Sequence, residues 1–152
     1  MSPPVLILGS LGDVEVGFRQ LRRTLPVETQ TVTTAEGPLV VPTLDELLCM
    51  KAFLCYDRRA TRDFLDFAAL SEKMSETEVV ASLLKVDRRY GEIQSRSVAL
   101  EVAKALSGAL PFDLNEEELP HYKALLPKWH TWQATRSVCH RYGVLLGEAL
   151  LR

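Results

Sequence analysis

Short apolar, β-favouring runs separated by glycine and proline make up the first part of the chain. The runs lie at residues 5–8, 14–18, 27–33 and 39–41. Such runs between turn-forming residues predict four short strands. The last two flank Glu36-Gly37-Pro38 and are expected to pair as a hairpin. The stretch FRQLRRTL has a weak helical pattern, so a helix within residues 16–25 is the alternative to the second strand.

Helix signals recur from Pro42 to the C-terminus. Residues 43–46 and 75–78 both fit a capping box. In the first, Thr43 is expected to accept a hydrogen bond from the Glu46 backbone N–H while the Glu46 side chain reaches back to the start of the helix. The predicted helices are 44–57, 60–73, 76–90, 95–107, a short one at 120–126, and 128–151. An apolar stripe of period three to four in the last one predicts a packing helix.

These elements predict an α+β fold, in which a small N-terminal β-sheet or hairpin precedes a predominantly helical array of five to six helices. The chain has 152 residues and a mass of 17.0 kDa, which suits one domain with a real core. We therefore expect a single domain over residues 1–152, with a strand-rich part at 1–42 and a helical part at 43–152.

The composition narrows the classes of function. No apolar run approaches the roughly 18 residues that a membrane span needs, and the N-terminal residues lack a basic leader, so a cytoplasmic protein without a membrane partner is expected. The 18 basic and 20 acidic side chains give a net charge of −2. A polyanion must therefore be met by a local patch of arginines. The three cysteines form no C-x-x-C pair and are expected to be reduced, mostly buried thiols.

Lys51 lies among apolar residues on the helix predicted at 44–57. Its neighbours three or four positions away are Leu47, Leu48, Leu54 and Cys55. Removing an ammonium group from water costs several kcal/mol, so an unpaired lysine would cancel the gain from burying about two leucines. We expect the Lys51 side chain either to reach water at the edge of the core or to meet a carboxylate or a phosphate.

The next predicted helix supplies carboxylates for Lys51. Asp63 and Asp66 are three residues apart on one side of it, and the two helices are expected to form an αα-hairpin. Arg59 and Arg62 each precede one of these aspartates by four residues, the spacing of an ion pair on a helix. Two interpretations stay open: a salt-bridge network that only holds the hairpin together, or a site where Lys51 contacts the phosphates of a nucleotide.

The segment VPTLDELLCMKAFLCYDRRATRDFLDFAAL resembles the AbiEii/AbiGii-type nucleotidyltransferases, toxin-like members of the polymerase β-like superfamily. The similarity covers about residues 39–75. It implies that Lys51 is the phosphate-contacting lysine and that Arg62, Asp63 and Asp66 form the arginine-aspartate motif. By the same resemblance, Lys51, Asp63 and Asp66 are candidate catalytic residues, and Lys51, Arg58 and Arg62 are candidate nucleotide-binding residues.

The resemblance also implies Mg²⁺ held by carboxylates of a small sheet, after a Gly-Ser and a helix-length spacer. Here Gly9-Ser10 is followed by Asp13 and Glu15 after only two residues. Asp13 and Glu15 are candidate metal ligands, because residues two apart on a strand face the same way. Glu28, on the strand before the turn of the predicted hairpin, is the candidate for the family's third carboxylate. The alternatives are that Asp13 and Glu15 are solvent-facing strand residues, or that the family's metal motif precedes this chain.

The function expected from the resemblance is that of an NTP-binding, nucleotidyltransferase-like protein of toxin-antitoxin type. Its activity would be Mg²⁺-dependent transfer of a nucleotide to tRNA, other RNA or protein. Because the spacing of the metal motif is broken, the alternative is a catalytically inactive remnant that serves as a protein-interaction or dimerisation module. Its partner would then be an antitoxin or a second copy of the chain.

Overall fold

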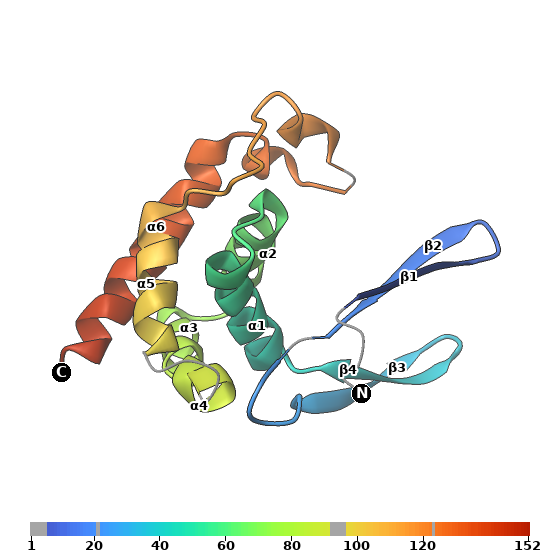
Figure 1. The fold of residues 1–152 in the computed structure, drawn as a ribbon, viewed down its shortest axis with the longest axis horizontal. Coiled ribbons are helices and arrows are strands. Elements are labelled where there is room, and N and C mark those ends of the chain that lie inside the picture. The colour runs from blue at the N-terminus through green and yellow to red at the C-terminus, as the bar shows by residue number, and fades with distance from the viewer. Residues whose placement is uncertain (1–5, 21, 92–96, 123) are drawn as a thin grey trace.

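The computed structural model describes residues 6–20, 22–91, 97–122 and 124–152. Two β-hairpins precede an array of helices, which confirms the predicted α+β class (Figure 1). The strands are β1 (Leu6–Leu11), β2 (Val14–Arg19), β3 (Thr29–Thr34) and β4 (Gly37–Pro42). The α-helices are α1 (Leu44–Asp57), α2 (Thr61–Ser71), α3 (Glu76–Leu83), α4 (Val86–Tyr90), α5 (Val98–Gly108) and α6 (Trp132–Leu150).

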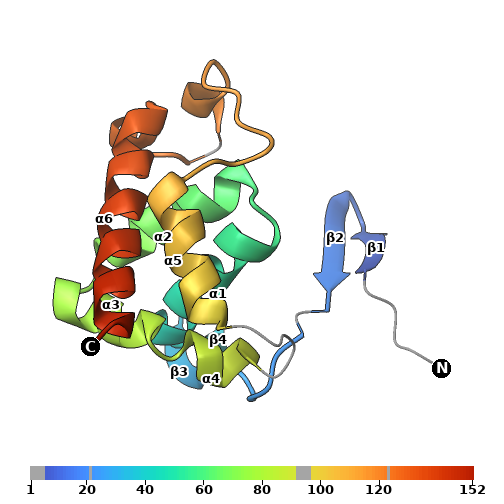
Figure 2. The same ribbon diagram turned by 60° about the vertical axis from the view of Figure 1, so that its left-hand side comes forward.

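The four strands form two separate antiparallel pairs, β1 with β2 and β3 with β4. The β3–β4 hairpin was predicted, and β2 forms in place of the alternative helix within residues 16–25. A two-residue loop closes β1–β2, and Gly12 in it has a φ of +60°, a conformation that costs glycine little. Figures 1 and 2 show this hairpin standing away from the helices, so the strands do not merge into one sheet.

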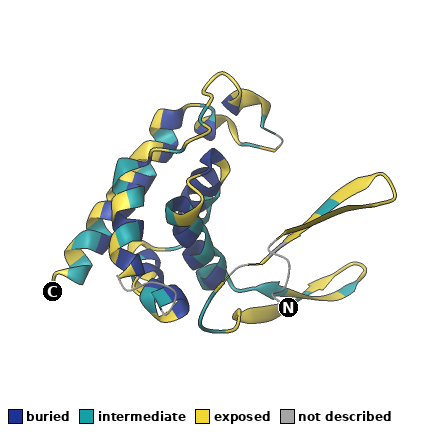
Figure 3. Ribbon diagram, in the orientation of Figure 1, coloured by how far each residue is buried: buried dark blue, intermediate teal, exposed yellow. Residues whose placement is uncertain are grey.

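The core lies among the helices. α1 packs against α2, α5 packs along α6, and α6 also contacts α2 and α3. Figure 3 shows the buried positions gathered on the facing sides of these helices, while both hairpins are mostly exposed. The predicted stripe of α6 is confirmed, because its buried residues are Trp132, Thr135, Cys139, Tyr142, Gly143 and Leu146. Among the described residues, no helix is both long enough and apolar enough to cross a membrane.

Three predicted helices are wrong in part. The helix expected at 76–90 is interrupted between α3 and α4. In the described residues 120–122 and 124–126 the expected short α-helix does not form; a 3₁₀ turn at Leu119–His121 overlaps its start, and another at Pro127–Trp129 follows it. Proline at residues 120 and 127 lacks the backbone N–H that a continuing helix needs. The helix expected from residue 128 begins only at Trp132, and the expected start of another at residue 95 lies outside the described residues.

Backbone and side-chain caps determine where the helices begin. Thr43 accepts from the Glu46 N–H as predicted, at 3.2 Å, and Ser75 with Glu78 forms the complete capping box. α2 has no cap from its own segment. Instead, Asp113 accepts hydrogen bonds from the backbone N–H and the hydroxyl of Thr61, at 2.7 and 2.8 Å. The start of α2, which carries the predicted site, therefore depends on a loop far along the chain.

Candidate functional site

Lys51 and the two aspartates come together in the α1–α2 hairpin. The Lys51 Nζ lies 2.7 Å from Asp66 Oδ2 and 3.1 Å from Asp63 Oδ1. Asp63 and Asp66 share one side of α2, and the Lys51 side chain is only 23% exposed at the edge of the core. The pairing between the two helices therefore has the arrangement that the spacing of these residues predicted.

The arginines extend this group only partly as expected. Arg62 Nε lies 3.9 Å from Asp66 Oδ2, in the predicted i,i+4 relation. Arg59 does not take its expected place beside Asp63. It precedes the first residue of α2 and has a φ of +52°, so the helical spacing does not apply, and its guanidinium donates to the Leu110 carbonyl at 3.0 Å. Arg58 takes the position beside Asp63 instead, with Nε 3.7 Å from Oδ2.

The five side chains Lys51, Arg58, Arg62, Asp63 and Asp66 are called the Lys51 site below. Burial acts to lower the pKa of Lys51, but Asp66 and Asp63 outweigh it, so this pKa is raised and the amine stays protonated. The three cations of the site face its two carboxylates, and Asp113 adds a third carboxylate near Arg58. Two of the three ammonium hydrogens can serve the aspartates, so one donor remains for a further acceptor.

One oxygen of the Lys51 site is incompletely satisfied. Asp63 is buried, and its Oδ2 has no hydrogen-bond partner in the described structure, although the Arg58 guanidinium lies nearby. A buried carboxylate oxygen usually has such a partner. Asp63 therefore holds Lys51 through one oxygen and keeps acceptor capacity on the other.

The candidate metal ligands Asp13, Glu15 and Glu28 are not brought together. Asp13 lies in the β1–β2 turn and Glu15 on exposed β2. Glu28 precedes β3, where its carboxylate lies 2.9 Å from Arg89 Nη2. Within the described ranges, no group of three His, Cys, Asp or Glu side chains is placed to hold a metal ion. These carboxylates do not fit a shared Mg²⁺ in this structure, because Arg89 engages one and the free-standing hairpin carries the other two.

A second charged group was missed by the sequence analysis. Glu46 is fully buried, and its carboxylate contacts the guanidinium groups of Arg23 and Arg89 and accepts from the Glu28 N–H at 3.2 Å. Arg89 also lies 2.7 Å from Asp45 Oδ2. The expected return of the Glu46 side chain to the start of α1 is therefore wrong, because these cations draw the carboxylate inward.

This group, called the Glu46 cluster, joins three parts of the chain: the segment before β3, the start of α1, and α4. The backbone adds to the connection, since the Thr24 N–H donates to the Arg89 carbonyl at 2.8 Å and the Thr43 N–H donates to the Glu28 carbonyl at 3.0 Å. The only sign of this cluster in the sequence is the acidic pair Asp45 and Glu46 at the start of α1, and acidic residues are common in the first turn of any helix. The cluster holds the β3–β4 hairpin against the helices.

The Glu46 cluster predicts that stability falls in acid. Burial raises the pKa of Asp45, but hydrogen bonds from Lys85, Ser82 and Arg89 outweigh it and lower that pKa to about 2. Because the folded pKa lies below the unfolded one, the stabilisation is complete above the unfolded pKa and is lost as the pH falls toward 2. Urea midpoints should fall between about pH 5 and pH 3. Asp45→Asn should flatten that decline, and an unchanged slope in this variant would contradict the assignment.

The cysteines are part of the core and offer no reactive group. Cys49, Cys55 and Cys139 are free and buried, as expected. Burial raises the pKa of the Cys49 thiol to about 11 and raises those of Cys55 and Cys139 as well. Thiols held protonated in this way are poor nucleophiles.

Comparison with known proteins gives partial matches only. No protein-family model matches the chain, and neither does any solved structure. The chain is 33% identical over 99 residues to the heme uptake protein MmpL11 of Mycobacterium tuberculosis (strain ATCC 25618 / H37Rv), a match covering 63% of this chain and 10% of that protein. It is 29% identical over 131 residues to the mycolic acid-containing lipids exporter MmpL11 of Mycolicibacterium smegmatis, covering 84% of this chain and 13% of that protein.

A probable transport protein MmpL11 of Mycobacterium leprae is 29% identical over 132 residues, which cover 84% of this chain and 12% of the relative. The chain thus spans only about a tenth of the length of the curated relatives it matches. The transport activities in their names belong to much longer proteins and assign no role to Lys51 or to the residues around it.

Proposed function

We propose that this chain is a nucleotidyltransferase-like protein that binds a nucleoside triphosphate at the Lys51 site. The observation that carries the proposal is the convergence of Lys51, Asp63 and Asp66 between α1 and α2, with Arg58 and Arg62 beside them. These are the residues to which the resemblance to AbiEii/AbiGii-type enzymes assigns nucleotide binding and catalysis. Ammonium and guanidinium groups are the side chains best suited to phosphate oxygens.

Accessibility supports binding over a purely structural role. The Arg62 side chain is 79% exposed and its contact with Asp66 is long, so it can turn toward a phosphate at little cost. Asp63 holds Lys51 from the buried side and fixes the direction of the ammonium group. A triphosphate would accept from the free Lys51 donor and from the two guanidinium groups.

Nucleotide transfer to tRNA, other RNA or protein is the activity that the resemblance suggests, in the cytoplasm, where NTPs are abundant. The expected cofactor is Mg²⁺, which would enter with the triphosphate. Because Asp13, Glu15 and Glu28 are not gathered, no transfer step is assigned to this chain's residues. Nucleotide binding needs only the Lys51 site, whereas transfer depends on carboxylates that the described structure does not assemble.

Calorimetric titration with ATP, GTP, CTP and UTP, each with Mg²⁺, tests the binding proposal. We expect saturable heat with at least one of them below millimolar concentration. Arg62→Ala should weaken binding by about tenfold, the loss of one charge-assisted contact, without changing the melting temperature. Arg136→Ala, which removes an exposed arginine from α6, is the matched control and should bind as the parent does.

Lys51→Met separates the two interpretations of the Lys51 site. It should abolish NTP binding, and circular dichroism should show whether the variant remains folded. If no NTP gives heat at millimolar concentration while the parent protein is folded, the binding proposal is wrong. Unchanged NTP affinity in a folded Lys51→Met variant would show that Lys51 does not contact the nucleotide.

The second candidate function is an interaction or dimerisation module, and the β1–β2 hairpin favours it. One face of that hairpin carries the cross-strand pairs Ile7–Phe18 and Leu11–Val14, and each of these four residues is more than half exposed. Exposed apolar faces of this kind commonly mark contact surfaces. The partner would be an antitoxin or a second copy. That segments similar to this chain occur within much longer proteins also suits a module.

A further inference from the structure

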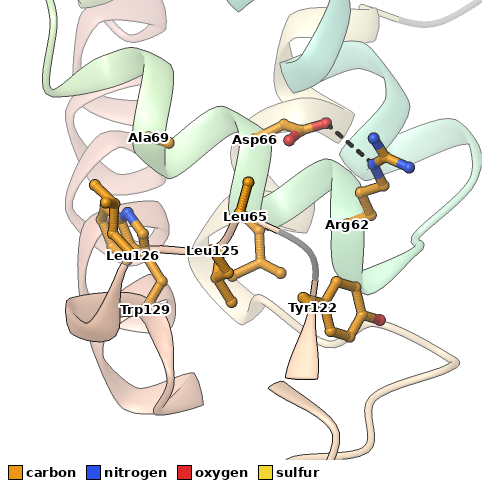
Figure 4. Close-up of a pocket in the computed structure, with 9 residues that line it drawn as sticks. Arg62, Leu65, Asp66, Ala69, Tyr122, Leu125, Leu126 and Trp129 are labelled. Atoms are coloured by element: carbon orange, nitrogen blue, oxygen red, sulfur yellow. Dashed lines mark ion pairs between the residues drawn. The ribbon is translucent and has the colours of Figure 1, made fainter. Parts of the chain in front are cut away.

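A cavity of about 510 Å³ opens beside the Lys51 site, in the size range of small-molecule pockets. One wall is α2, whose residues Arg62, Leu65, Asp66 and Ala69 follow the i, i+3, i+4, i+7 spacing of a single helix face. The opposite wall comes from the segment between α5 and α6, with Tyr122, Leu125, Leu126 and Trp129 (Figure 4). We call this cavity the α2 pocket.

The α2 pocket is polar at one end and apolar at the other. Figure 4 shows Arg62 and Asp66 on one side, Trp129 and Leu126 on the far side, and Leu65 and Leu125 between them. Asp66 belongs both to the pocket and to the Lys51 site, because its Oδ2 lies 2.7 Å from Lys51 Nζ. A molecule with an anionic end and a flat apolar body would match this gradient.

We infer that the α2 pocket takes the nucleoside part of the triphosphate whose phosphates bind at the Lys51 site, an inference that rests on the proposed function. A nucleobase has two apolar faces that fit between leucine and aromatic side chains. The ribose would lie near Arg62 and Asp66, where the pocket meets the phosphate site. Ala69 is the one small residue among the α2 positions named, and it leaves room for a flat ring. The α2 helix thus presents one face that serves both halves of the ligand.

Two kinds of ligand separate binding of the phosphates from binding of the nucleoside. Inorganic tripolyphosphate carries the phosphates alone, and the four NTPs add the nucleoside. The α2 pocket predicts that the best NTP binds at least about tenfold more tightly than tripolyphosphate, because the apolar nucleoside is buried only in the NTP complex. Ala69→Phe fills the pocket and should reduce NTP affinity to that of tripolyphosphate, while tripolyphosphate affinity stays the same. Ala81→Phe, on the exposed side of α3, is the matched control.

These titrations distinguish failure of the proposed function from failure of the pocket assignment alone. If neither tripolyphosphate nor any NTP binds, the proposed function itself is wrong, and this inference with it. If tripolyphosphate binds as tightly as every NTP, or if Ala69→Phe leaves NTP affinity unchanged, the phosphate site stands and the pocket assignment is overturned. Should Ala69→Phe fail to fold, Leu126→Asp replaces an exposed wall residue and must weaken NTP but not tripolyphosphate binding.

Discussion

Glu46→Gln is expected to lower the free energy of unfolding by about 3 kcal/mol, because removing one member of a buried ion pair leaves the other charge uncompensated. The Glu46 side chain is 0% exposed, and that of Arg23 is 8% exposed. Arg23 would keep carbonyl contacts with Leu25 and Pro26 and lose its carboxylate. Glutamine has the same size as glutamate, so the effect reports on charge and not on a cavity. Chemical unfolding in urea at neutral pH measures it.

Glu101→Gln is the control for Glu46→Gln. It removes the same charge from an i,i+3 pair with Lys104 on the surface of α5, where the cost should stay below about 0.5 kcal/mol. Equal effects of the two substitutions would show that the Glu46 cluster contributes no more than a surface pair. A large loss for Glu46→Gln alone would establish the cluster as the connection between the β3–β4 hairpin and the helices.

Gly143→Ala is expected to lower the free energy of unfolding by about 3 kcal/mol, at the upper end of what overpacking usually costs. A Cβ at this position of α6 would lie 2.4 Å from the Ser107 backbone nitrogen and 2.8 Å from the Ala103 carbonyl oxygen. Ordinary contacts between non-bonded atoms are about 3.5–4.0 Å. Backbone atoms of α5 cannot turn aside as a flexible side chain can, so the two helices would have to separate. Thermal or urea unfolding measures the loss.

Gly147→Ala is the matched control, one turn further along α6. Apart from the chain neighbours and the nearby backbone of α6 itself, no atom lies within 4 Å of a Cβ built there, so only the helix propensity changes. The substitution should raise the free energy of unfolding by about 0.5–1 kcal/mol. If Gly143→Ala were also neutral or stabilising, the close approach of α5 and α6 would not exist in solution as described.

The Lys51 site and the Glu46 cluster show two uses of buried charge in one helix. Both involve α1, about one and a half turns apart, yet the Glu46 carboxylate is fully buried while the Lys51 ammonium remains partly exposed. The Glu46 carboxylate and the guanidinium groups paired with it are buried, whereas the Lys51 site keeps one ammonium donor and two exposed guanidinium groups. This difference, more than the number of charges, makes the Lys51 site the better candidate for binding.

Much of this molecule follows from periodicity within one or two neighbouring elements. The helical part, the β3–β4 hairpin and the apolar stripe of α6 depend on local patterns, because burying one face of a helix or strand requires regular spacing. The contacts of Lys51 with Asp63 and Asp66 could be predicted for the same reason. Both aspartates lie on the helix that follows α1 after a short break, and a half-buried ammonium group needs a partner.

The tertiary structure alone decided the features that join distant segments. Glu46 meets Arg23 and Arg89, and Asp113 caps α2, only because the packing of several elements places them together, and no spacing along the chain encodes such distances. The same holds for the wall of the α2 pocket formed by the segment between α5 and α6. The tertiary structure also decided that Asp13 and Glu15 lie apart from Glu28. They share the strand spacing of metal ligands, but in the part of the chain that the structure describes, their hairpin pairs with no third strand that could bring Glu28 beside them.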